Sequence, residues 1–93
     1  MSVTFNIPGA LRGFAGGRSQ VEIGDSVTTL SEAFEALWTL CPGMRDRVMT
    51  EQGLVREHIN VFIGTEDVRY LGGLTAKVPA EAEISILAAV SGG

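Results

Sequence analysis

The sequence predicts an α+β fold in which one main helix packs on one face of a mixed sheet. Short segments near both ends of the chain alternate apolar and polar residues, as half-buried strands do, whereas residues 30–40 follow the three-or-four spacing of an amphipathic helix. The chain has 93 residues, 45% of them apolar, and a mean hydropathy of +0.24, which suits one small folded domain rather than a disordered chain. We expect residues 1–87 to form this domain and residues 88–93 to form a flexible tail.

The first two strands are expected to form a hairpin. Val3–Ile7 alternates apolar and polar side chains, and Pro8 ends the strand. The glycine-rich stretch up to Gly17 lacks the Lys-Ser/Thr pair of a phosphate-binding loop and precedes a strand, so it is interpreted as a long loop. The second strand then places Val21 and Ile23 on one side.

The main helix is expected over Leu30–Leu40. Its apolar stripe consists of Leu30, Ala33, Phe34, Leu37 and Leu40. Thr29 precedes Glu32 by three residues, which is the spacing of a capping box. Pro42 and the glycine after it end the helix, and a shorter helical turn is expected over Met44–Met49.

Two further strands complete the expected sheet. They cover Ile59–Ile63 and Ile84–Leu87, with isoleucine and valine side chains directed at the helix. Phe62 and Leu87 must then stand on the opposite face of the sheet. Single exposed apolar residues are common, but two on one sheet predict a surface patch for a partner.

Charge excludes some classes of partner. The chain has 11 acidic and 7 basic residues, a net charge of −4 and a pI near 4.8. Binding to nucleic acid needs clustered Lys and Arg, and Lys77 is the single lysine, so we expect no nucleic-acid partner. The acidic balance favours a partner with a basic surface. The longest apolar run, Ile86–Val90, is too short to cross a bilayer, and no signal peptide is evident, so we expect a cytoplasmic protein without a membrane partner.

The rare reactive side chains argue against catalysis. Cys41 is the single cysteine and His58 the single histidine, too few for a disulfide or a structural zinc site. No cation is adjacent to Cys41 in the sequence, so we expect a small buried hydrophobe there, and we expect His58 at the surface. Neither a Ser-His-Asp nor a Cys-His arrangement is apparent, and pockets of useful size are rare on so small a domain. We therefore expect no enzymatic activity, bound cofactor or metal.

The C-terminal segment carries the clearest functional signal. After Leu87 every charge and bulky side chain is lost, and the chain ends Ala88-Ala89-Val90-Ser91-Gly92-Gly93. Six extended residues reach roughly 20 Å, enough to thread a narrow channel in another protein. Glycine has no Cβ, so the carboxylate of Gly93 is unhindered; with an ordinary pKa of about 3.5 it is ionised at neutral pH and can attack a phosphate of ATP. A frayed terminus is the alternative explanation.

Several segments, spread over nearly the whole chain, stand in the order found in one known family. They are Gly9-Ala10-Leu11-Arg12 with Gly16-Gly17, the helix up to Cys41-Pro42-Gly43, Ile59–Ile63, Thr65–Arg69 with Gly72-Gly73-Leu74, and Val90-Ser91-Gly92-Gly93. The chain thus resembles the ubiquitin-like sulfur carrier proteins of the thiamin carrier and molybdopterin synthase small subunit family. Among its members, the similarity is greatest to the carrier that serves a dedicated cysteine synthase. The resemblance implies the β-grasp fold.

The resemblance also implies a protein co-substrate rather than an enzyme. An E1-like enzyme would adenylate Gly93 with ATP, and sulfur transfer would then convert its carboxylate to a thiocarboxylate. In the cysteine branch, the acceptor would be an aminoacrylate held on a cysteine synthase that contains pyridoxal phosphate. The reaction site would be Gly93 with Gly92. The residues expected to contact the partners are Phe62, Leu87, Val90 and Ser91.

Two departures from the family leave the acceptor open. Relatives often have proline ahead of the last four residues and an Asp-Gly turn before the final strand, where this chain has Ala88-Ala89 and residues 80–83. The alternatives are a molybdopterin synthase small subunit with its large subunit as partner, a carrier for thiamin, tRNA thiolation or a secondary metabolite, a modifier that forms isopeptide bonds, and a plain binding module. In some relatives a metalloprotease trims residues beyond the glycines; since this chain ends on Gly93, we expect no such cut.

Overall fold

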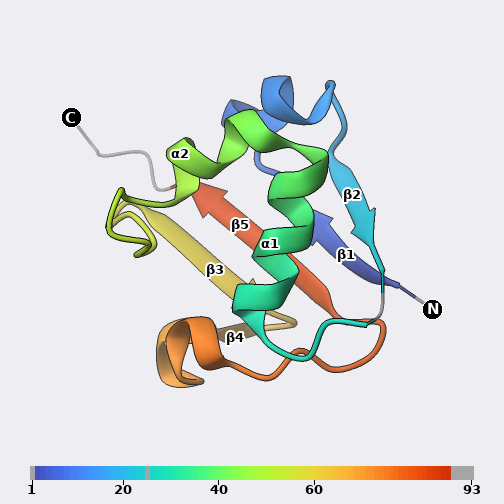
Figure 1. Cartoon of the computed structure of the whole chain (residues 1–93), viewed down its shortest axis with the longest axis vertical. Helices are drawn as coiled ribbons and strands as arrows, with labels where there is room; N and C mark the ends of the chain where they lie inside the picture. The colour runs from blue at the N-terminus through green and yellow to red at the C-terminus, as the bar shows by residue number, and fades with distance from the viewer. Residues whose placement is uncertain (1, 25, 89–93) are drawn as a thin grey trace.

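Five strands form one mixed sheet, and the main helix crosses one of its faces (Figure 1). The computed structural model of the chain describes residues 2–24 and 26–88. The strands are β1 (Val3–Asn6), β2 (Gln20–Ile23), β3 (Ile59–Ile63), β4 (Glu66–Asp67) and β5 (Glu83–Ala88), in the spatial order β2-β1-β5-β3-β4. The central strands β1 and β5 are parallel, and the other neighbours are antiparallel. This is the β-grasp arrangement expected from the sequence.

Two α-helices and four 3₁₀ helices connect the strands. They are α1 (Leu30–Leu40), α2 (Arg45–Val48), η1 (Gly9–Ala15), η2 (Pro42–Met44), η3 (Val68–Tyr70) and η4 (Gly73–Thr75). The predicted bounds of α1 are confirmed, and so is its capping box. The hydroxyl of Thr29 accepts a hydrogen bond from the Glu32 N–H at 3.3 Å, and the Glu32 carboxylate accepts one from the Thr29 N–H.

The glycine-rich stretch after β1 is a helix, so the prediction of a long loop was wrong. Two of its four apolar side chains, Leu11 and Ala15, are buried and hold η1 on the core. Gly16 and Gly17 follow with φ of +65° and +84°, a backbone conformation that favours glycine and ends the helix. The turn-forming residues in this stretch favoured a loop, so the sequence did not predict the helix η1.

Other element bounds differ from the predictions by one or two residues. β1 ends at Asn6, although Ile7 beyond it is still buried. β5 is one residue longer at each end than predicted and therefore includes Ala88. The helical turn expected after Pro42 is divided between η2 and α2. Neither β4 nor the two short helices η3 and η4 had been predicted.

The core lies between α1 and the sheet. Phe34 stacks on Phe5 of β1 at 5.6 Å between ring centroids and on Trp38 one turn along the helix at 5.1 Å. Leu40, predicted on the apolar stripe, is 52% exposed, and Cys41 takes the inward position instead. Cys41 follows Leu37 by four residues, which is 40° more than a full turn of the helix, so it stays on the buried face. Leu40 follows Leu37 by three residues, which is 60° less than a full turn, and so lies at the edge of that face.

Candidate functional site

The last residues that the structure describes belong to β5. Ala88, the last described residue, pairs with Ile59 at the end of a five-residue antiparallel ladder between β5 and β3. The residues predicted to carry the chemistry or to line a partner's channel lie outside the described residues; these are Val90, Ser91, Gly92 and Gly93. Their roles therefore stay predictions, as does the boundary between domain and tail.

Phe62 and Leu87 both lie on the face of the sheet opposite α1, as the alternation in the sequence predicts. Phe62 is opposite Ser85 and Leu87 is opposite Asn60, so the two apolar side chains are diagonal neighbours on adjacent strands. Leu87 is 48% exposed, whereas Phe62 is half-buried. We call Phe62 and Leu87 the outer-face pair; Leu87 is its more accessible member.

A hydrogen-bonded network borders this pair on the side of β1. The Asn6 amide donates to Glu83 Oε1 at 2.8 Å and to Ser85 Oγ at 3.0 Å, and it accepts from Gln20 Nε2 at 2.9 Å. Three strands thus contribute to one connected set of side chains. Such a set holds its members in place and offers polar groups at the rim of an apolar contact.

An ion pair borders the outer-face pair on the other side. Arg69 Nη2 donates to Asp67 Oδ2 at 2.7 Å and to Asn60 Oδ1 at 3.1 Å, and Asp67 is the cross-strand partner of Phe62. Hydrogen bonds from the side chain and the backbone N–H of Arg69 hold the pKa of Asp67 below its usual value, and the same contact raises the pKa of Arg69. Both groups are therefore charged at neutral pH.

A cavity of about 500 Å³ lies on the helix side of β3, beside residues 54–57 and the helices η3 and η4. This volume is within the range of ligand pockets, which was not expected for so small a domain. Its lining is mainly apolar and includes the Asp67–Arg69 pair, Arg56 and Glu57, but no serine, cysteine or histidine. The cavity therefore supplies no hydroxyl, thiol or imidazole group.

Cys41 and His58 lie where the sequence predicts them. Cys41 is 2% exposed, which confirms a buried hydrophobe, but the fold brings Arg18 Nη2 to 3.9 Å from its Sγ, a cation that its sequence neighbours did not reveal. His58 is exposed directly before β3. Within residues 2–24 and 26–88, no three His, Cys, Asp or Glu side chains gather as metal ligands would. In the same part of the chain, no helix has the length and apolar character needed to span a membrane.

Several exposed apolar side chains were missed by the sequence prediction. Tyr70 is 86% exposed on η3, and Leu54 is 62% exposed in the segment before β3. Phe14, on η1, is 37% exposed and lies under the guanidinium of Arg47, whose central carbon is 5.2 Å from the ring centroid. The helices η1 and η3 are too short to produce a readable period, so the sequence carried no signal for these positions.

Comparison with known proteins places the chain in a family. The ThiS family matches residues 5–93. Sulfur carrier protein CysO of Mycobacterium tuberculosis is 33% identical over 96 residues, and the match covers 100% of both chains.

Solved structures agree with the sequence match. A chain of the BexX/CysO complex of Amycolatopsis orientalis superposes with a TM-score of 0.88 and 36% identity, covering 98% of this chain and 99% of that one. CysO of M. tuberculosis gives a TM-score of 0.85 at 32% identity, with 95% and 99% covered. The small archaeal modifier protein SAMP1 of Haloferax volcanii gives 0.84 at 28% identity over the full length of both chains. These similarities confirm the ubiquitin-like β-grasp fold.

These findings decide between an enzyme and a carrier. Proteins of the ThiS family are carriers rather than catalysts. The family match covers nearly the whole chain, and a relative more than 30% identical matches from end to end. The chain therefore belongs to the ThiS family of sulfur carrier proteins.

Proposed function

We propose that this chain donates sulfur for cysteine biosynthesis and carries it as a thiocarboxylate on Gly93. The observation that carries the proposal is the similarity to CysO, which covers 100% of both chains and so extends over Gly92-Gly93. A carrier needs a stable domain, a surface for its partner and a terminus that other enzymes can modify. The packed core supports the first, and we assign the second to the outer-face pair.

The chemistry begins with activation of the terminal carboxylate. In an E1-like enzyme, an oxygen of the Gly93 carboxylate attacks the α-phosphorus of ATP and pyrophosphate leaves, so that an acyl adenylate forms. Hydrosulfide then attacks the acyl carbon and AMP leaves with one of the original carboxylate oxygens, so that a thiocarboxylate forms and a proton is released. Gly92 has no side chain to obstruct either attack. ATP is a substrate of the activating enzyme, so the carrier itself binds no cofactor.

The sulfur then passes to an acceptor enzyme. We assign this role to a cysteine synthase with pyridoxal phosphate, which supplies the difficult chemistry while the carrier supplies a tethered sulfur nucleophile. A CysO relative has been solved in a complex with BexX, which supports the view that carriers of this type act while docked on another protein. A molybdopterin synthase large subunit, or an enzyme of thiamin, tRNA or secondary-metabolite thiolation, would take the same place in the alternative pathways.

The outer-face pair is the docking surface in this proposal. Leu87 lies in β5 directly before residues 88–93, the predicted tail. A partner that takes up this tail therefore comes close to Leu87. Val90 and Ser91 then lie in the partner's channel. The polar network and the ion pair on either side of Phe62 and Leu87 supply a rim of hydrogen-bonding groups around an apolar centre, as in many protein interfaces.

Intact-mass analysis tests the carrier chemistry. The chain is incubated with the E1-like enzyme of its own organism, ATP and a sulfur source, and a species in which one oxygen is exchanged for sulfur should appear. A variant lacking Gly93 is the control and should stay unmodified. If no such species forms under conditions in which the E1-like enzyme releases pyrophosphate, the thiocarboxylate proposal is wrong.

A second measurement identifies the acceptor. The thiocarboxylated chain is mixed with the cysteine synthase that accompanies it and with the serine derivative from which that enzyme forms its aminoacrylate. The sulfur adds to the aminoacrylate, water hydrolyses the bond to the Gly93 carbonyl carbon, and the cysteine released is quantified. Stoichiometric loss of sulfur with formation of cysteine supports the pathway. Transfer of the sulfur to a molybdopterin synthase large subunit, with no cysteine formed, would show that the protein serves molybdopterin synthesis instead.

A protein modifier is the second candidate function, because SAMP1 is similar over its full length. A modifier would join the carboxyl carbon of Gly93 to a lysine amine as an isopeptide bond after the same activation. Conjugates on a denaturing gel that vanish when Gly93 is deleted would favour the modifier. Both functions can coexist, so the gel is run on the cells in which the thiocarboxylate is measured.

A further inference from the structure

The positive charge of the chain is concentrated in two segments. Residues 7–20 and 40–49 together contain four arginines and one aspartate, a net charge of 4 − 1 = +3. All remaining residues contain three basic and ten acidic side chains, a net charge of 3 − 10 = −7. The overall −4 therefore conceals a strongly uneven distribution.

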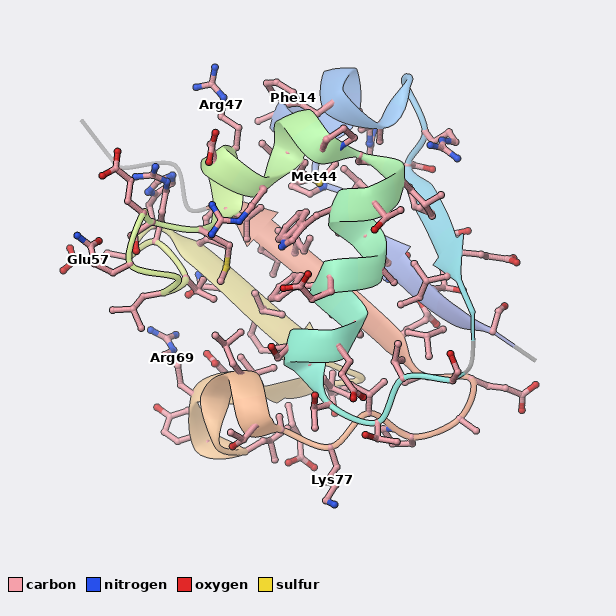
Figure 2. All side chains as sticks on the ribbon, in the orientation of Figure 1. Phe14, Met44, Arg47, Glu57, Arg69 and Lys77 are labelled. Carbon is pink, nitrogen blue, oxygen red and sulfur yellow. The ribbon has the colours of Figure 1, made fainter. Side chains whose placement is uncertain are left out.

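The fold brings these two segments together. Phe14 of η1 lies beneath the Arg47 guanidinium of α2, and a Cβ on Gly43 would lie 3.2 Å from the Phe14 ring. Arg18, just after η1, reaches the Cys41 sulfur at the end of α1. We define the arginine patch as Arg12, Phe14, Arg18 and Arg47. Figure 2 shows Phe14 and Arg47 at one end of the molecule and Lys77 at the opposite end.

Within residues 2–24 and 26–88, no carboxylate pairs with the arginines of the patch, and other contacts hold them in place. Arg12 Nε donates to the Ile7 carbonyl at 3.0 Å, Arg18 Nε donates to the Ala15 carbonyl at 2.7 Å, and Arg47 rests on the Phe14 ring. Among the described residues, ion pairs form only between Arg45 and Asp46 and between Arg69 and Asp67. Guanidinium groups that are already oriented lose less entropy on binding carboxylates.

The arginine patch lies at the end of the sheet from which the tail leaves. Because β1 and β5 are parallel, η1, which follows β1, lies at the same end of the sheet as Ala88, the last described residue of β5 (Figure 1). A chain of backbone contacts also joins α2 to this end. The Arg56 N–H donates to the Val48 carbonyl at 2.9 Å, the Ile59 N–H donates to the Arg56 carbonyl at 2.9 Å, and Ile59 pairs with Ala88.

We propose that the arginine patch docks on an acidic surface beside the channel of the enzyme that activates the tail, an inference that rests on the proposed function. An enzyme that takes up the tail must approach this end of the molecule. Arginine and aromatic side chains together are typical of the residues that dominate protein interfaces. Nucleic acid does not suit the patch, because the remaining surface with its charge of −7 would repel it. The sign of this contact is opposite to the basic partner surface that the net charge alone favours.

Kinetics with a matched pair of charge reversals test the inference. Arg47→Glu changes the patch, and Lys77→Glu makes the same change in net charge at the opposite end. Pyrophosphate release by the E1-like enzyme is measured against carrier concentration. We expect Arg47→Glu to lower kcat/KM about 10-fold at low salt with kcat unchanged, and Lys77→Glu to change it less than about 2-fold.

Higher salt should lower kcat/KM of the natural chain toward that of Arg47→Glu. Arg47→Gln, which removes the charge without reversing it, should fall between them, and thermal unfolding of each variant verifies the fold.

Equal effects of the two reversals, or faster activation of Arg47→Glu, would overturn the inference. If the natural chain is not activated at all, the proposed function fails, and the inference is then decided by an NMR titration of the chain with hexaglutamate. Shifts confined to residues 9–18 and 42–48 would support an acid-binding patch. Shifts elsewhere, or none, would refute it.

Discussion

At the scale of single residues, the segment between η3 and η4 requires glycine at position 72. Gly72 has φ of +100°, and a Cβ at this position would lie 2.8 Å from Thr75 Oγ1. The same hydroxyl donates a hydrogen bond to the Gly72 carbonyl at 2.8 Å, so it is not free to move away. Backbone conformation and side-chain space therefore both require glycine.

The first prediction concerns this glycine. Gly72→Ala should lower the free energy of unfolding by about 1–2 kcal/mol, because alanine is strained at this φ and crowds Thr75. Urea denaturation measures the change. Gly9→Ala is the control, since its added Cβ meets no atom within 4 Å, and it should change stability by less than about 0.5 kcal/mol. Equal losses in the two variants would contradict this account of Gly72.

At the scale of elements, α1 is stabilised at its start by a carboxylate and along its length by aromatic stacking. The Glu32 carboxylate accepts from the Thr28 N–H at 2.7 Å, the Thr28 hydroxyl at 2.8 Å and the Thr29 N–H at 3.3 Å. These bonds, the Thr28 N–H first, lower the pKa of Glu32 below its usual value. The charged form of Glu32 is therefore favoured by folding.

The second prediction follows from the sign of this shift. A carboxyl group whose pKa is lowered on folding stabilises the protein above its unfolded-state pKa and loses that contribution as pH falls through the folded-state pKa. The natural chain should thus lose stability below about pH 5, and Glu32→Gln should lose less over the same range. Denaturation curves at several pH values measure this. Glu35→Gln, one turn further along α1, should retain the pH dependence of the natural chain.

The third prediction concerns the packed face of α1. Phe34→Ala should cost about 3–5 kcal/mol, because it removes the ring stacked between Phe5 and Trp38. Leu40→Ala, in the same helix but 52% exposed, should cost less than about 1 kcal/mol. Thermal and urea unfolding measure both variants. A large loss of unfolding free energy in Leu40→Ala would show instead that Leu40 belongs to the buried stripe, as the sequence predicts.

At the scale of the whole molecule, the β-grasp core presents two distinct surfaces near the start of the tail. The outer-face pair lies on the open side of the sheet, and the arginine patch lies on η1 and α2. Both are joined to β5, directly or through its neighbours, so a partner that takes up the tail can contact both.

The fourth prediction tests the outer-face pair in activation. Leu87→Ser should lower kcat/KM with the E1-like enzyme about 10-fold, because burying a leucine contributes about 1.5–3 kcal/mol to an apolar contact. Unfolding should change little, since Leu87 is 48% exposed. Tyr70→Ser is the matched control; it removes a side chain that is 86% exposed on η3 and should leave activation unchanged. A loss confined to Tyr70→Ser would place the docking surface on η3 instead.

Features encoded over a few neighbouring residues could be predicted from the sequence. The bounds of α1 follow from helical spacing and the Thr29–Glu32 cap, and the outward direction of Phe62 and Leu87 follows from strand alternation. The Gly-Gly terminus needs no fold to be recognised. The fold class, the carrier family and the candidate reaction site were therefore available from the sequence alone.

What only the tertiary structure decided depends on residues that are distant in the chain. The burial of η1, the inward position of Cys41 in place of Leu40, and the half-burial of Phe62 result from packing between elements. The contact of Arg18 with Cys41 and that of Arg47 with Phe14 bring segments together that the sequence separates by more than 20 residues. The net charge is a sum over all residues and does not say where in the fold the charges lie. Only the parallel pairing of β1 with β5 places the arginines at the end of the sheet where the tail begins.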